Sequence, residues 1–199
     1  MTGSYSVAEE EHSKQQYNFI RNEIWILSWA AASQRANIFP KNISEKERRS
    51  LRNNLKLNLF KILDQFTAKE QISDNLLIKK IILLVEKHRN NNFRFNVGHS
   101  QKLINISLKY YWCMGWLKNE PPHCPIDRII LTKAGIKVDG KTPSWTKMDN
   151  IEDYKSYIKE LKNISNPKTI HTWDKILEAN STRYEKRMNR RFDIHFFYD

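Results

Sequence analysis

Lys102 is the residue best suited to covalent chemistry, because it lies near the start of a strongly apolar segment with helical spacing. A helix beginning near Ser100 would place Lys102 in its opening turn, where the charged amine loses solvation and faces the positive end of the helix dipole. Both effects lower the expected pKa of Lys102. A neutral amine can attack a carbon centre, which is what a covalent lysine must do. The alternative is a lysine that extends its ammonium from the helix end into solvent.

Asp127 occupies the same kind of position on the next predicted helix. It follows Pro125 and Ile126 and precedes the segment RIILTKAG. Its carboxylate can therefore accept hydrogen bonds from the first amides of that helix and stay ionised. On its own this pattern is typical of a helix N-cap. A catalytic role is favoured by the pair together with its surroundings, VGHSQKLINISLKYYW and PPHCPIDRIIL.

The stretch from about 95 to 131 resembles the helix-hairpin-helix DNA glycosylases, especially the lysine-bearing 8-oxoguanine glycosylases including the archaeal branch. Those enzymes have a hairpin, a lysine at the start of an apolar helix, and then a Pro-hydrophobic-Asp turn that opens another helix. The resemblance assigns Lys102 to the nucleophilic lysine and Asp127 to the aspartate of the turn. It also assigns Val97 and Gly98 to the end of the hairpin.

Base excision needs both residue types. Cleavage of an N-glycosidic bond develops positive charge at the sugar C1′, which the carboxylate of Asp127 can stabilise. The resemblance implies a second step, in which Lys102 attacks C1′, forms a Schiff base and allows the strand to be cut by elimination. An oxidised purine is the usual substrate in this family, but the sequence does not specify the base. No cofactor is expected.

The hairpin is expected to hold a phosphate beside the lysine through the free amides of a helix N-terminus. These amides belong to Gly98, His99, Ser100 and Gln101. The chain departs from the family pattern in having Asn96 where a first glycine is common, and in the spacing between the hairpin and the lysine.

An extruded base also needs a stacking surface. All 6 tryptophans are eligible, and we take Trp25 and Trp29, with His123, as the first candidates for the base pocket. Each tryptophan could instead belong to the hydrophobic core.

Composition favours nucleic acid as the partner. Lys and Arg number 34 against 22 Asp and Glu, which gives a net charge of +12 and attracts polyanions. Arg48, Arg52 and Lys56 recur every four residues on a predicted helix, and this stripe either follows a phosphate backbone or is a solvated face. The run RYEKRMNRR near the C-terminus has the same two interpretations.

Cysteine content and apolar patterning limit the other classes of protein. The chain has 2 cysteines, too few for a disulfide framework or an iron–sulfur cluster, which fits a cytoplasmic protein. A zinc site formed by His99, His123, Cys113 and Cys124 lacks the usual ligand spacing, so no metal is expected. No apolar run approaches the roughly 18 residues that a membrane span needs.

The spacing of apolar residues predicts an all-α, glycosylase-like fold with helical lobes around a cleft. We expect a single domain over residues 1–199, with a flexible N-terminus at 1–16. Helices are predicted at about 17–34, 74–88, 100–117 and 151–164, and after Ser44, Asp127 and Pro167.

We therefore predict a monomeric DNA glycosylase that flips out and excises a damaged or modified base from double-stranded DNA, in repair or in defence against modified phage DNA. The main alternative is a non-enzymatic helical DNA-binding protein that uses the same hairpin and basic faces. A third is an RNA-binding accessory protein. The pair of Lys102 and Asp127 separates the first from the others, because a binding module has no need of it.

Overall fold

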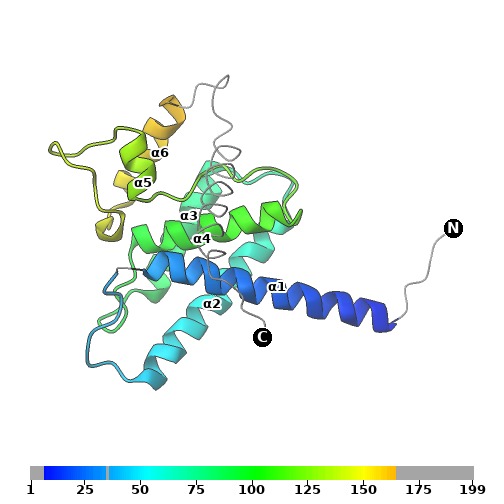
Figure 1. The fold of residues 1–199 in the computed structure, drawn as a ribbon. Coiled ribbons are helices and arrows are strands. Elements are labelled where there is room, and N and C mark those ends of the chain that lie inside the picture. Colours follow the sequence, from blue (N-terminus) through cyan, green and yellow to red (C-terminus); the bar gives the residue numbers. More distant parts are fainter. Residues whose placement is uncertain (1–6, 35, 165–199) are drawn as a thin grey trace, which may run out of the picture. The chain divides into compact units, whose positions relative to one another are not determined.

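The computed structural model describes residues 7–34 and 36–164. Its helices are α1 (Val7–Ser33), α2 (Glu45–Thr67), α3 (Asp74–His88), α4 (Val97–Cys113), α5 (Arg128–Lys133), the short 3-10 helix η1 (Trp145–Lys147) and α6 (Ile151–Ile164), as drawn in Figure 1. Among these residues there is no β-strand, only two isolated bridges. The described part of the chain is therefore all-α, as the apolar spacing predicts.

Most predicted helix positions agree with the structure, and two differ at their starts. Helix α1 begins at Val7, so residues 7–16, predicted as part of a flexible tail, are helical. Helix α4 runs from Val97 to Cys113, so it starts three residues before and ends four residues before the predicted bounds. It starts earlier because Asn96 caps α4, with its side chain accepting a hydrogen bond from His99 N, and Asn is a strong N-cap residue.

Helix α2 follows from its sequence in a simple way. The hydroxyl of Ser44 caps its start by accepting a hydrogen bond from Glu47 N at 3.2 Å. Its predicted apolar face is buried through Leu55, Leu59, Ile62, Leu63 and Phe66. The Glu47 side chain does not complete a capping box with Ser44, and its Oε1 instead accepts a hydrogen bond from the Asn92 amide at 2.6 Å.

Helix α4 lies at the centre of the helical packing and contacts α1, α2, α3 and η1. Leu103, Ile104 and Leu108 are fully buried on it, as expected for a strongly apolar segment with helical spacing. Helix α3, the loop 89–96 and α4 form the expected helix, short loop and helix. Lys102 and Gln101 therefore stand on the most enclosed helix of the described chain.

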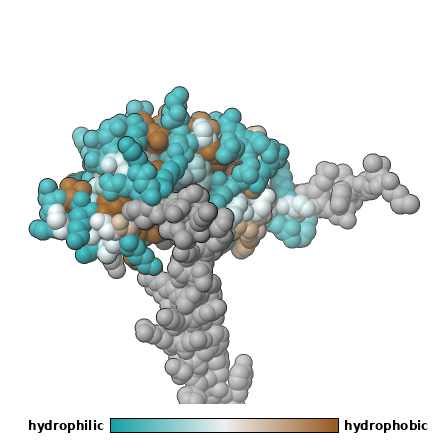
Figure 2. All heavy atoms as spheres, turned by 90° about the horizontal axis from the view of Figure 1, so that it is seen from above, coloured by the Kyte–Doolittle hydropathy of each residue, from teal (hydrophilic) through white to brown (hydrophobic). Residues whose placement is uncertain are grey.

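The chain divides into two compact units, residues 1–157 and 158–199. Of the second unit only 158–164, the end of α6, is described. The helix predicted from Pro167 and the basic run at 183–191 lie outside the described residues. Within the described residues, no helix is long and apolar enough to cross a membrane. Hydrophilic residues cover much of the face drawn in Figure 2, with smaller hydrophobic areas between them.

Candidate active site

Lys102 lies between a carboxylate and an indole ring. Its Nζ is 3.7 Å from Asp127 Oδ2, and its side chain is 11 % exposed. The same nitrogen lies 4.1 Å from the centroid of the Trp145 ring, which is a cation–π distance. Because α4 begins at Val97, Lys102 is in the second turn, where the helix dipole acts weakly. Burial therefore disfavours the charged amine, while Asp127 and Trp145 favour it.

The two carboxylate oxygens of Asp127 make different contacts. Oδ1 accepts hydrogen bonds from Ile129 N at 2.9 Å and Ile130 N at 3.1 Å, which makes Asp127 the N-cap of α5. Oδ2 faces Lys102. The sequence left the cap and the catalytic role as alternatives, but the geometry makes them compatible. The two backbone amides hold the carboxylate in one orientation, so its second oxygen stays directed at the amine.

The start of α4 does not offer the free amides that the hairpin prediction requires. Gly98 N donates to Met148 O at 2.9 Å, and Ser100 N donates to Asn96 O at 3.0 Å. His99 N donates to Asn96 Oδ1 at 3.1 Å. Gly98, His99, Ser100 and Gln101 are all buried. The expectation that these amides are free for a phosphate is therefore wrong, because the protein's own groups already accept from them.

His99 completes the cap of α4 instead of reaching DNA. Its Nδ1 accepts a hydrogen bond from Asn96 N at 3.2 Å, which requires that nitrogen to carry no proton. Burial, followed by the nearby charge of Arg89, lowers the pKa of His99 to about 4. The ring is therefore neutral at pH 7, as the capping bond needs.

Gly98 has a packing role that the resemblance did not indicate. A Cβ at this position would lie 1.8 Å from the carbonyl oxygen of Trp145 and 3.3 Å from Met148 Cβ. The segment 145–148 thus lies directly on the first turn of α4, and Asn96 Nδ2 also donates to Thr146 O at 2.9 Å. These contacts bring the Trp145 indole to Lys102, so a glycine is needed here for close approach.

Trp145 is the aromatic residue that contacts Lys102, rather than the tryptophans chosen from the sequence. Trp25 and Trp29 stack on each other with centroids 5.6 Å apart. Trp29 also packs against Phe39 and Phe93, at 6.3 Å each. These two indoles are thus part of an aromatic cluster formed by α1 and the loops. Trp145 begins the three-residue 3-10 helix η1, which is too short to show periodic apolar spacing, so only the contact of this segment with Gly98 and Asn96 identifies it.

His123 is also unsuited to touching a base in this conformation. It is 2 % exposed, and its Nδ1 lies 2.8 Å from the Tyr154 hydroxyl. Its Nε2 is 3.4 Å from Asp74 Oδ1 on α3. His123 therefore links the loop before Asp127 to α3 and to the first half of α6, as a buried structural residue.

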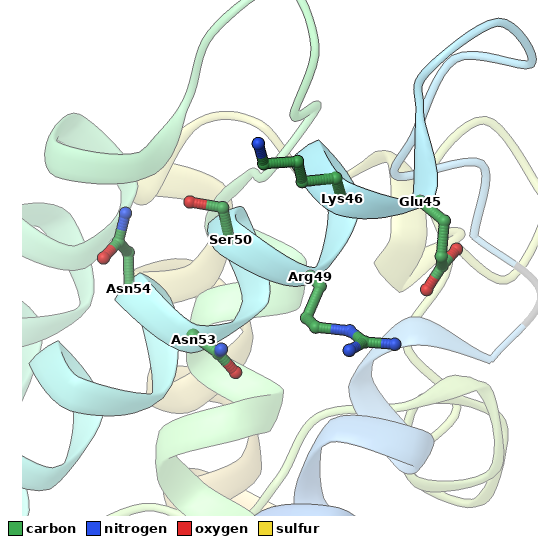
Figure 3. A pocket seen from close by; sticks show the side chains of 6 residues that line it. All are labelled: Glu45, Lys46, Arg49, Ser50, Asn53 and Asn54. Carbon is green, nitrogen blue, oxygen red and sulfur yellow. The ribbon is translucent and has the colours of Figure 1, made fainter.

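The predicted basic stripe on α2 is partly engaged within the protein. Arg48 pairs with Glu45 at 3.7 Å and lies 5.4 Å over the Phe39 ring, and Arg52 is half-buried. A shallow hollow beside it is lined by Glu45, Lys46, Arg49, Ser50, Asn53 and Asn54. Figure 3 shows that these six side chains all come from α2 and spread outward instead of converging. This surface can contact a polyanion, but its side chains do not converge to form a specific binding site.

The described residues hold no group of three or more His, Cys, Asp or Glu side chains that could bind a metal ion. Cys113 is exposed and Cys124 is buried, and both are free thiols. Comparison with models of protein families, with curated proteins and with solved structures gave no match to this chain.

Proposed function

We propose that this chain is a DNA glycosylase with an abasic-site lyase activity, in which Lys102 attacks C1′ and Asp127 stabilises the positive charge that develops there. The observation that carries the proposal is the 3.7 Å separation of Lys102 Nζ and Asp127 Oδ2, beside a carboxylate that is 29 % exposed. A single sugar carbon can lie within reach of both groups. Holding both groups near one reacting atom is a large part of what catalysis needs.

The separate contacts of the two Asp127 oxygens suit this role. Because two backbone amides hold Oδ1, the charge that faces the sugar is positioned before substrate arrives. The ammonium of Lys102 must lose a proton before it attacks. Asp127 Oδ2 is a proton acceptor next to it, and burial of the lysine stem favours the neutral amine once the proton has left.

Trp145 supplies a surface for the extruded base. Lys102 already lies against the face of this indole, so a nucleotide that brings its C1′ to the amine also brings its base to the ring. Stacking on an aromatic side chain is the usual support for a flipped base. Since Lys102 is only 11 % exposed, we expect the segment 145–148 to shift when the substrate enters.

Double-stranded DNA is the partner that the charge favours. The chain carries a net charge of +12, and such an excess binds phosphate backbones by releasing counterions. The first turn of α4 has no place in this binding, because its amides are occupied within the protein. The phosphate contacts are instead assigned to basic side chains, including Arg52 on α2.

A non-enzymatic helical DNA-binding protein is the second candidate. Its support is that the contacts of Lys102 with Asp127 and Trp145 are also what a buried structural lysine needs. In that case the positive charge of the chain is the functional feature, and the pair only joins α4 to α5.

A duplex with a single abasic site separates the two candidates without knowledge of the target base. We expect the wild-type protein to cut this duplex by elimination, and the Lys102→Ala variant to bind it without cutting. Duplexes that each carry one modified base, treated with alkali after incubation, then identify the excised base. Tight binding with neither abasic-site cleavage nor base release by the wild type would favour the second candidate.

A further inference from the structure

A buried glutamine clamps the backbone of the residue before Asp127. Gln101 is fully buried on α4. Its Nε2 donates to Ile126 O at 2.8 Å, and its Oε1 accepts from Ile126 N at 3.0 Å. One side-chain amide thus satisfies both backbone groups of a loop residue, which fixes the orientation of the peptide on each side of it.

A second buried amide supports this clamp from the next turn of the helix. Asn105 lies four residues after Gln101, on the same face of α4. Its Nδ2 lies 3.4 Å from Gln101 Oε1 and 3.4 Å from Cys124 O. It also donates to the Tyr154 hydroxyl at 3.1 Å. The loop residues 124–126 are therefore attached to α4 through a polar network with no exposure to solvent.

The clamp sets the alignment of the two chain segments that carry the candidate pair. Gln101 and Lys102 are neighbours on α4, and Ile126 and Asp127 are neighbours at the start of α5. Holding Ile126 against Gln101 therefore fixes how far Asp127 Oδ2 lies from Lys102 Nζ. The carboxylate is oriented by α5, while its position relative to the amine depends on Gln101.

We propose that Gln101 is a positioning residue that holds Asp127 at its working distance from Lys102, and that it acts through the backbone of Ile126. This inference rests on the proposed lyase and glycosylase function. In this proposal Gln101 does not contact DNA. Its loss should slow the chemical step while leaving the affinity for the duplex unchanged, because the affinity depends on basic side chains elsewhere.

Gln101→Glu provides a readout that a merely structural role would not move. The neutral carboxylic acid has one donor and one acceptor and can replace both hydrogen bonds, whereas the ionised form has no donor for Ile126 O. Burial raises the pKa of a carboxyl group, so the neutral form should prevail at low pH. The ratio of variant to wild-type rate should therefore fall as the pH rises.

The measurement is single-turnover cleavage of an abasic-site duplex between pH 5 and 8.5, with duplex Kd and the far-UV circular dichroism spectrum recorded at each pH. Gln101→Met, similar in length but unable to clamp, should cleave about 10- to 100-fold more slowly at every pH with unchanged Kd, since a misplacement near 1 Å can cost about 100-fold. Gln101→Glu should approach the wild-type rate near pH 5 and fall about 10-fold or more by pH 8.5.

Ser107→Ala is the matched control. Ser107 is fully buried on α4 and donates to Leu103 O at 2.9 Å within the same helix, so this variant removes a buried hydrogen bond that does not reach the loop. It should keep the wild-type rate at every pH. The inference would be overturned if the ratio of the Gln101→Glu rate to the wild-type rate did not change with pH, or if Gln101→Met cleaved at the wild-type rate.

If a Gln101 variant does not show the wild-type circular dichroism spectrum, the same cleavage measurement is made on Asn105→Ser. It removes the support of the clamp and should slow cleavage about 3- to 10-fold at unchanged Kd, on the same positional argument. A wild-type rate in that variant would also overturn the inference. Failure of the proposed function looks different, because the wild-type protein itself would then leave the abasic duplex uncut, and the role of Gln101 would fall with it.

Discussion

A methyl group at Gly98 should displace the segment that covers Lys102. The Cβ of Gly98→Ala would meet the Trp145 carbonyl oxygen at 1.8 Å and its carbon at 3.0 Å, so the backbone of 145–148 must move. Overpacking of this kind costs about 1–3 kcal/mol, and loss of the hydrogen bond from Gly98 N to Met148 O adds about 1 kcal/mol. The higher helix propensity of alanine than of glycine offsets up to about 1 kcal/mol of this loss. The net loss of stability is about 1–3 kcal/mol.

Urea unfolding measures that loss, and acetylation of Lys102, followed by mass spectrometry, measures the displacement. Gly135→Ala is the matched control, because the same methyl enters open space at φ +69° and costs only about 1–2 kcal/mol of left-handed strain. Lys102 should become more reactive in the Gly98 variant and stay protected in the Gly135 variant. A Gly98→Ala protein as stable as the wild type, or more stable, would refute this packing, because helix propensity would then be the only effect present.

Three further results are expected. Asp127→Asn keeps the cap, which alone would change stability by only a few tenths of a kcal/mol, and loses the ion pair with Lys102, which adds up to about 1 kcal/mol. Abasic-site cleavage should slow about 100-fold or more, and near-normal cleavage would leave Asp127 as a structural residue alone. Duplex affinity should fall steeply with salt, and Arg48→Ala combined with Arg52→Ala should flatten that slope in a fluorescence titration, whereas an unchanged slope would mark a solvated face. Burial lowers the pKa of His99 from 6.5 to about 4. Between pH 6.5 and pH 4 the unfolded chain therefore binds a proton at His99 that the folded chain does not bind, and the free energy of unfolding measured in urea should fall as the pH decreases. His99→Gln keeps a capping side chain and should reduce that loss, and an equal pH dependence in both proteins would contradict it.

The helices were largely predictable because their signals are local. Ser44 and Asp127 each cap a helix through a bond that spans two or three residues, and the buried faces of α2 and α3 repeat with helical spacing. The Asn96 cap is equally local, but it was missed, and the start of α4 was therefore predicted three residues late. Such features depend on residues close together in the chain. The pairing of Lys102 and Asp127, which are 25 residues apart, was instead expected from the resemblance to the glycosylases.

The parts that the sequence did not predict depend on distant segments. Met148, whose carbonyl accepts from Gly98 N, is 50 residues from Gly98 in the chain, and Trp145, whose indole covers Lys102, is 43 residues from Lys102. Both lie in or next to the short 3-10 helix η1, in a segment without periodic apolar spacing. His123 was misassigned for the same reason, since its partner Tyr154 is 31 residues away. Gln101 was chosen as a phosphate contact, and only the fold places its side chain against Ile126.

Borohydride trapping on an abasic-site duplex tests the central claim most directly, because reduction fixes the Schiff base between the lysine and the sugar as a stable adduct. Lys109→Ala is the matched control, since Lys109 also lies on α4 with its Nζ 4.6 Å from the Tyr110 ring and has its pKa lowered by burial. We predict that the wild type and Lys109→Ala form the adduct, that peptide mapping places it on Lys102, and that Lys102→Ala forms none. Undiminished trapping by Lys102→Ala, or no adduct with the wild type, would contradict the account.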